Sequence, residues 1–174
     1  GFGSNGGVAE DCNDFDEDAF PGAEEIPDNG KVEDCNGPDL IANSQEAVFV
    51  SADAASGGDG SKFSPLQSLK AGMQKANSED KIVVVASGVY EVDELVFESS
   101  VHGGYNAETW ERDGLGTTTI QGIGGFSLVV PQQAKVRISG VTLSGGGDFL
   151  SYSFTNGGEV RMDDSTIVQT SAGS

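Results

Sequence analysis

The segment VRISGVTL (136–143) decides the fold, because it returns 24 residues later as VRMDDSTI (160–167). Each copy has two short apolar stretches on either side of a turn. A glycine-rich opening that leads to a phenylalanine repeats in the same way from Gly124 to Gly146. A period in the low twenties, with several short strands in each repeat, is typical of a solenoid.

The rest of the chain after Pro38 also consists of short apolar stretches separated by glycine, and nothing after Ala76 has a helical pattern. We therefore expect an all-β protein, a right-handed parallel β-helix whose apolar residues stack inward while Arg, Thr and Ser face outward. An antiparallel sandwich is the alternative. It does not require the same residues one period later. The strands are expected at 47–50, 81–85, 94–97, 118–120, 126–129, 136–138, 141–143, 149–154, 160–162 and 166–168.

One amphipathic helix is expected before these strands. Ser64 and Pro65 provide an N-cap and a proline at the first helical position. Leu66, Leu69 and Met73, with Ala76 beyond them, then form one apolar stripe. We expect this helix to cap the exposed first coil of the solenoid.

The N-terminal part carries the pattern of a calcium loop. Calcium prefers hard oxygen ligands, and a loop can supply them at positions 1, 3, 5, 7 and 12. These positions are filled by Asp14, Asp16, Asp18, the carbonyl of Phe20, and Glu25. A second set of oxygen ligands consists of Asp11, Asn13, Asp28, Asp34, Asn36 and Asp39. A solvated acidic leader is the alternative, because twelve of the 28 acidic residues lie in the first 40 positions.

The two cysteines, Cys12 and Cys35, occupy the same place in two copies of Glu-Asp-Cys-Asn. Such a pair indicates either a disulfide in an oxidising compartment or half of a soft-metal site. The only histidine, His102, is far away in the sequence, so a tetrahedral zinc site lacks ligands and the disulfide is favoured.

The blocks Asp11-Cys-Asn-Asp14-Phe-Asp16, Pro21-Gly22-Ala23-Glu24-Glu25 and Asp34-Cys-Asn-Gly37 resemble the aspartate- and cysteine-rich metal-binding repeat of bacterial surface proteins, the MopE-type repeat. The resemblance covers about 30 residues. It departs at Pro27, where the family usually has another cysteine, and this departure argues against a copper role.

The chain from Val48 onward resembles the N-terminal part of bacterial surface β-helix proteins of the pectin-lyase-like class. The resemblance is carried by Val48-Phe-Val50-Ser51, Ser64-Pro65-Leu66-Gln-Ser-Leu69, Ser87-Gly88-Val-Tyr90, and Gly103-Gly104-Tyr105 with Trp110. It implies the fold. It implies no single activity, because this class includes lyases, hydrolases, adhesins and inert spacers.

Charge and composition limit the partners and divide the chain. A formal net charge of -19 argues against nucleic acid and against anionic membranes, and no apolar run is long enough to span a bilayer. The expected organisation is a loose end at 1–9, the calcium segment at 10–40, a strand, loop and capping helix at 41–80, and coils at 81–174. The sequence has no signal peptide, so we expect a mature or trimmed chain.

An active site is weighed against structural roles. Asp148, Asp163 and Asp164, with Arg137 and Arg161 one coil apart, could serve a polysaccharide lyase or hydrolase. We favour an exposed arginine ladder and an aspartate turn. We also expect His102 to pack at a strand end. Tyr105 and Trp110 are expected to cover the open edge of the first coil rather than to stack on a sugar. Asp53 and Asp59 are a further hypothesis, a second calcium loop.

The sequence therefore predicts no catalytic residue. It predicts a secreted or outer-surface bacterial protein that binds calcium and has a structural or adhesive role. Two partners are considered: another copy of the chain, bound through an open C-terminal coil, and a polysaccharide. The alternatives are the N-terminal portion of a carbohydrate-active enzyme and a passive spacer.

Overall fold

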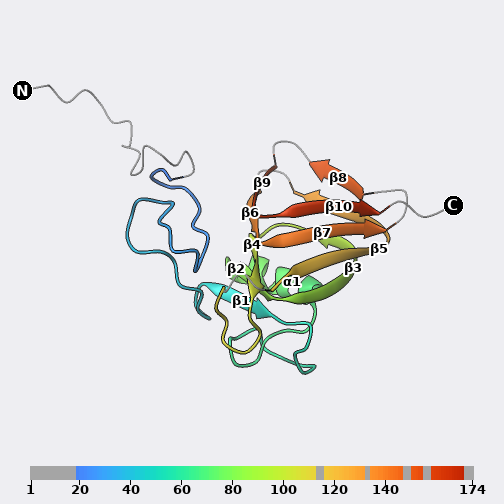
Figure 1. Cartoon of the computed structure of the whole chain (residues 1–174), viewed down its shortest axis with the longest axis horizontal. Coiled ribbons are helices and arrows are strands. Elements are labelled where there is room, and N and C mark those ends of the chain that lie inside the picture. The colour runs from blue at the N-terminus through green and yellow to red at the C-terminus, as the bar shows by residue number, and fades with distance from the viewer. Residues whose placement is uncertain (1–18, 113–115, 132–133, 147–149, 155–157, 171–174) are drawn as a thin grey trace, which may run out of the picture. The chain divides into compact units, whose positions relative to one another are not determined.

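The structure is a computed structural model, and it describes residues 19–112, 116–131, 134–146, 150–154 and 158–170. The chain divides into two compact units, 1–41 and 42–174, and all the regular secondary structure of the described residues belongs to the second unit (Figure 1).

The first sheet of the second unit has five parallel strands, and its order is β1-β2-β4-β6-β9. The strands are β1 (Ala47–Val50), β2 (Ile82–Ala86), β4 (Val101–Tyr105), β6 (Lys135–Ser139) and β9 (Glu159–Asp163).

The second sheet is also parallel and has the order β10-β7-β5-β3, with β8 paired to another part of β5. Its strands are β3 (Gly88–Val96), β5 (Thr118–Val130), β7 (Val141–Gly146), β8 (Leu150–Phe154) and β10 (Thr166–Thr170). The chain passes from the first sheet to the second four times, from β2 to β3, β4 to β5, β6 to β7 and β9 to β10 (Figure 1).

The 24-residue repeat is confirmed at the level of strand pairing. Val136 lies opposite Val160 and Ile138 opposite Met162, in the pairing of β6 with β9. Leu143 lies opposite Ile167 in the pairing of β7 with β10. The repeated residues therefore stack on one another across neighbouring parallel strands.

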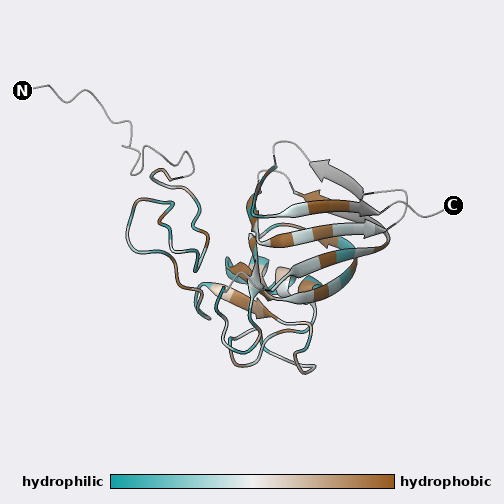
Figure 2. Cartoon of the chain, in the orientation of Figure 1, coloured by the Kyte–Doolittle hydropathy of each residue, from teal (hydrophilic) through white to brown (hydrophobic). Residues whose placement is uncertain are grey.

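The main hydrophobic core is built from one face of each sheet together with the helix, and Figure 2 shows hydrophobic residues recurring along the strands of both sheets. Among its fully buried side chains are Leu95, Phe97, Ile120, Ile138 and Leu143. In β1 and β2 the alternate residues Phe49 and Val84 belong to a second hydrophobic cluster, on the opposite face of the first sheet.

The helix α1 spans Leu69–Glu79, so the predicted start at Ser64-Pro65 is wrong. Ser68 is the N-cap, and its side chain accepts a hydrogen bond from the backbone N–H of Ala71. Leu66 lies before the helix and forms a parallel bridge with Val50. The buried face predicted from Leu69, Met73 and Ala76 is confirmed.

The predicted fold class is wrong. Instead of a single all-β right-handed β-helix, the chain forms two parallel sheets and a helix, an arrangement of the α/β type. The helix belongs to the connection between the parallel strands β1 and β2, as in a βαβ unit, and it packs on β1, β2 and β3. The continuous apolar runs of β1 and β2 are typical of parallel strands that are buried on both faces.

The strand spacing explains why the repeat misled the prediction. Val83 pairs with Val101, 18 residues later, whereas Val101 pairs with Ile138, 37 residues later. The 24-residue period holds between Ile138 and Met162. The regular period therefore describes the C-terminal strands, and it does not extend to the whole chain.

The strand β4 was not predicted, because its sequence VHGGY contains two glycines and glycine weakens a strand in isolation. Packing explains the glycine at position 103. A Cβ atom there would lie 2.6 Å from the carbonyl oxygen of Gly140 and 2.8 Å from Cβ of Thr118. The strand therefore needs a residue without a side chain, where neighbouring backbone comes very close.

No helix among the described residues is long and apolar enough to cross a bilayer.

The two turns that leave β6 and β9 allow a matched test. Gly140 (φ 64°) and Asp164 (φ 46°) occupy the same place in the two repeats, both in the left-handed region. Asp164→Gly should be neutral or stabilise by about 0.5 kcal/mol, because glycine removes the left-handed strain at an entropic cost of similar size. Gly140→Asp should destabilise by about 2 kcal/mol or more, since its Cβ would also lie 2.6 Å from Nη2 of Arg112.

Urea unfolding of the two variants measures both effects. Equal destabilisation by the two substitutions would contradict the assignment of these turns.

Candidate functional site

A row of polar side chains lies on the outward face of the first sheet, next to the second hydrophobic cluster. Val84 of β2 lies opposite His102 of β4, His102 lies opposite Ser139 of β6, and Ser139 lies opposite Asp163 of β9. We call His102, Ser139 and Asp163, together with Arg112 and Arg137, the polar ladder.

Ser139 joins two members of the polar ladder. Its Oγ lies 2.8 Å from Nδ1 of His102 and accepts a hydrogen bond from Nη2 of Arg112 at 3.3 Å. Arg112 also lies over the ring of Tyr105, with its guanidinium carbon 5.6 Å from the ring centre. Arg112 therefore ties the segment that follows β4 to the face of the sheet.

Arg137 and Asp163 form a buried ion pair with two hydrogen bonds. Nε of Arg137 donates to Oδ2 of Asp163 at 2.7 Å, and Nη2 donates to Oδ1 at 3.2 Å. The side chain of Arg137 is only 4 % exposed. The prediction of an exposed arginine ladder is therefore wrong for Arg137, whereas Arg161, 3.5 Å from Asp163, is 39 % exposed.

The charges of the polar ladder are set by burial. Desolvation, aided by the positive charges of Arg112 and Arg137, lowers the pKa of His102 to about 3, and the charge of Asp163 opposes this only in part. Burial raises the pKa of Asp163, but hydrogen bonds and charges from Arg137 and Arg161 outweigh it and hold that pKa below its ordinary value. At neutral pH the histidine is therefore uncharged and the aspartate is ionised.

This arrangement is not suited to nucleophilic catalysis. Ser139 and His102 are 1 % and 0 % exposed, so a substrate has no access to them. The aspartate is bound to arginines rather than to the histidine, which leaves the histidine without an orienting carboxylate. The polar ladder instead fixes structure.

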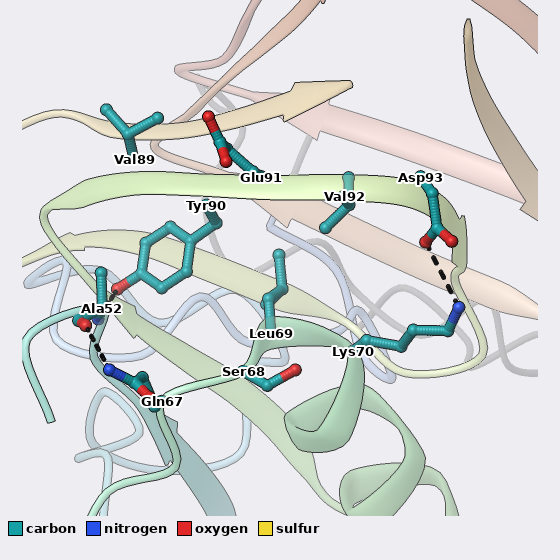
Figure 3. Close-up of a pocket in the computed structure, with 10 residues that line it drawn as sticks. All are labelled: Ala52, Gln67, Ser68, Leu69, Lys70, Val89, Tyr90, Glu91, Val92 and Asp93. Atoms are coloured by element: carbon teal, nitrogen blue, oxygen red, sulfur yellow. Dashed lines mark hydrogen bonds and ion pairs between the residues drawn. The ribbon is translucent and has the colours of Figure 1, made fainter. Parts of the chain in front are cut away.

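A cleft of about 380 Å³ lies beside the start of α1, and Figure 3 shows Tyr90 of β3 directed toward Ala52 and Val92 of the same strand directed toward Leu69. Its lining residues are Ala52, Gln67, Ser68, Leu69, Lys70, Val89, Tyr90, Glu91, Val92 and Asp93.

The polar groups of this cleft are largely engaged within the chain. Lys70 forms an ion pair with Asp93 at 3.4 Å, and Gln67 donates to the carbonyl of Ala52 (Figure 3). The hydroxyl of Tyr90 donates to the carbonyl of Ala86 and accepts from the N–H of Ala52. We therefore assign no ligand to the cleft.

Six of the predicted site residues lie outside the described residues, and they include three of the five main calcium ligands. These six are Asp11, Cys12, Asn13, Asp14, Asp16 and Asp18. The aspartate Asp148, weighed as a catalytic residue, also lies outside them.

In the described part of the N-terminal unit, the charge of Glu33 acts on two other carboxylates, those of Glu25 and Asp39. Glu25 accepts from the backbone N–H of Asp34 at 2.7 Å and from that of Leu40 at 3.4 Å. Glu33 accepts from the N–H of Ile26.

Asp39 accepts from the N–H of Gly30 through Oδ2, while its Oδ1 is buried and has no hydrogen-bond partner among the described residues.

The pKa values in this acidic group are raised. Burial, with the nearby charge of Glu33, raises the pKa of Glu25, although hydrogen bonds from the backbone lower it in part. Burial also raises the pKa of Asp39, with the charges of Asp28 and Glu33 acting in the same direction. Negative charge is therefore destabilised at this place.

The other predicted ligands of this unit have local partners. The carbonyl of Phe20 accepts from the N–H of Ala23, and the carboxylate of Asp34 accepts from the backbone and side chain of Asn36. Within the described ranges no group of three or more His, Cys, Asp or Glu side chains is arranged to hold a metal ion.

The remaining candidates have structural partners. Trp110 packs edge-on against Phe49, with ring centres 4.8 Å apart, in the second hydrophobic cluster that also contains Tyr105. Asp59 accepts from the N–H of Ser61. Sequence reasoning did not single out Ser139, Arg112 and Glu33. Ser139 and Glu33 lie inside repeated segments, but their partners, such as His102 for Ser139, are set by the fold.

No family model, curated protein or solved structure matches this chain. The functional proposals therefore rest on its own residues.

The two arginines of the repeat provide a test of the polar ladder. Arg137→Met should destabilise the protein by about 3 kcal/mol, because it leaves the largely buried Asp163 with one weaker partner. Arg161→Met is the matched control one repeat later, and it should cost less than about 1 kcal/mol. Guanidinium unfolding measures both values, and similar costs would show that burial does not distinguish the two arginines.

Proposed function

We propose that this chain is a secreted or outer-surface bacterial protein that binds calcium through its N-terminal unit and has a structural or adhesive role. The observation that carries the proposal is the ligand spacing from Asp14 to Glu25, which supplies hard oxygens at the positions that a calcium loop uses. The resemblance to the MopE-type repeat supports the same proposal.

The described acidic group adds a physical reason for a cation. The pKa values of Glu25 and Asp39 are raised chiefly because burial disfavours their ionised forms, and the charge of Glu33, with that of Asp28 at Asp39, acts in the same direction. A bound divalent cation would offset both effects and favour the ionised carboxylates.

The hydrogen bonds of Glu25 do not conflict with metal binding. Each carboxylate oxygen has two acceptor sites, and the backbone N–H groups of Asp34 and Leu40 use one on each oxygen. The backbone N–H of Glu33 also acts on this carboxylate, and the acceptor sites that remain can bind the metal. The backbone bonds would then hold Glu25 in place for the bidentate role expected of position 12.

We further propose a disulfide between Cys12 and Cys35. Cys35 has a left-handed backbone (φ 63°), and the described residues contain no free cysteine. Closing a loop of this length would stabilise the segment by about 3 kcal/mol on the chain-entropy model. This matters in a unit whose buried apolar residues, Ala19 and Ile26 among them, are few.

A structural role fits the remaining observations better than the enzyme alternative. Asp163 and Arg137, weighed for polysaccharide cleavage, neutralise each other under the surface. Asp164 lies in a left-handed turn. A net charge of -19 disfavours nucleic acid as a partner.

Self-association remains a proposal for the edge formed by β9 and β10. These strands end the order of the two sheets, and Ile167 and Val168 are 44 % and 39 % exposed. An edge with apolar side chains favours pairing with another strand. A polysaccharide ligand also stays a prediction.

Glu25→Gln should weaken calcium binding at least tenfold, because it removes one charge from the bidentate ligand while keeping its size. Isothermal titration calorimetry on the oxidised protein measures the affinity. Glu24→Gln is the matched control, since it removes the same charge from the exposed neighbour outside the ligand pattern. Absence of calcium binding by the unmodified protein, or equal weakening by both substitutions, would sink the proposal.

Peptide mapping without reductant should recover the Cys12 and Cys35 peptides as one linked species. Cys12→Ser with Cys35→Ser should make residues 10–40 more sensitive to protease while the strands from β2 onward keep their amide protection, because the two units are separately compact. Two alkylatable thiols in native protein would count against both the disulfide and the extracellular assignment.

A further inference from the structure

The segment that follows β4, residues 106–112, lies against the outward face of the first sheet, where Trp110 and Arg112 contact residues of its strands. Two backbone hydrogen bonds close it on itself, from the N–H of Asn106 to the carbonyl of Glu111 and from the N–H of Trp110 to the carbonyl of Asn106. An isolated antiparallel bridge joins Arg112 to Tyr105.

Trp110 is the buried anchor of this segment. Its indole is 5 % exposed and packs edge-on against Phe49. Its backbone has a φ of 57°, which is unfavourable for a bulky residue. Such a conformation persists only when the surrounding contacts impose it. The closed segment is therefore held against a local strain.

His102 lies at the centre of the contacts that hold the segment. It is fully buried, its Nδ1 lies 2.8 Å from Oγ of Ser139, and its Nε2 has no hydrogen-bond partner among the described residues. Arg112 reaches the same hydroxyl from the segment.

The charged groups that face His102 come from three elements. Arg112 belongs to the segment and Arg137 to β6, and both oppose a positive charge on the imidazole. Asp163 of β9 favours such a charge, but it is already bound to Arg137 and lies beside Arg161. The residue opposite on β2 is Val84, which is apolar.

A proton on His102 would therefore place a third positive charge next to Arg112 and Arg137, and Asp163, the described carboxylate whose charge acts on His102, is already paired with Arg137. Arg137 is fixed by two hydrogen bonds to Asp163 within paired strands. Arg112 lies outside the named strands, so moving it breaks no strand pairing other than the isolated bridge to Tyr105. Departure of the segment would give the imidazolium access to water.

We propose that residues 106–112 form an acid-released latch, in which protonation of His102 expels Arg112 and exposes Trp110 together with the hydrophobic surface around Phe49. The latch is independent of the calcium proposal, because none of the predicted calcium ligands takes part in it.

The sign of the pH dependence follows from the two states. A histidine in contact with water has a pKa of about 6.5, whereas burial lowers the pKa of His102 to about 3 in the closed state. The closed state is therefore fully favoured above pH 6.5 and loses stability as the pH falls toward 3. Between pH 7 and pH 4.5 the ratio of open to closed protein should rise about 100-fold.

Site-resolved hydrogen exchange in the presence of a calcium chelator tests the latch. The protection factors of the Asn106 and Trp110 amides, corrected for the intrinsic pH dependence, should fall about 100-fold between pH 7 and pH 4.5. Those of β6 and β9 should fall much less. The lower pH is still above the isoelectric point of about 4.1, so the protein keeps a negative charge.

Two native probes give independent readouts, because the chain has one tryptophan and one histidine. Quenching of Trp110 fluorescence by acrylamide should increase with acid while the far-ultraviolet circular dichroism is retained. The single histidine resonance in the NMR spectrum should show no titration near pH 6.5.

His102→Asn is the matched variant, since its amide can still donate to Ser139 but cannot take up a proton. Its segment should keep its protection at pH 4.5. Three outcomes would each overturn the proposal. The variant could lose protection as the wild type does, the loss could be equal in β6 and β9, or His102 could titrate near pH 6.5 with Trp110 still protected. If the variant does not fold, the exchange profile and the histidine titration of the wild type decide between release and retention.

Discussion

The in-register parallel pairing of strands from successive passes of the chain is the constraint on which the structure depends. Because each strand of the first sheet lies beside the next at fixed register, a side chain on one strand dictates what its neighbour must accommodate. On the inward face this stacks Ile138 on Met162. On the outward face it places His102, Ser139 and Asp163 in one line, and burial of that line forces every polar group in it to find a partner or stay uncharged.

The sequence predicted the parts of the fold that depend on local pattern. The repeat from Val136 to Ile167 correctly paired β6 with β9 and β7 with β10. It could not reveal that the earlier passes have unequal lengths, nor that α1 connects two parallel strands, because these features depend on contacts between distant residues. The strand β4 was missed for the same reason, since its glycines make sense only beside Gly140 and Thr118.

Prediction of the sites was limited by burial. Arg137 and Arg161 occupy the same place in the two repeats, yet one is nearly inaccessible and the other is partly exposed, because β9 covers β6 while β9 ends the order of its sheet. A local pattern contains no such information. The proposed calcium ligands are different, since they are close in sequence and the expectation rests on their spacing alone.

The sequence separations between paired residues of the first sheet are unequal, and this affects where the chain can accept insertions. The entropy of closing a loop grows only with the logarithm of its length, so the 37-residue separation between Val101 and Ile138 costs about 0.4 kcal/mol more than the 24-residue separation between Ile138 and Met162. Residues inserted between paired strands of this protein would therefore cost little loop entropy. In the connection between β4 and β5, an insertion must also leave Trp110 against Phe49 and Arg112 against Ser139, because these contacts belong to the packed face of the first sheet.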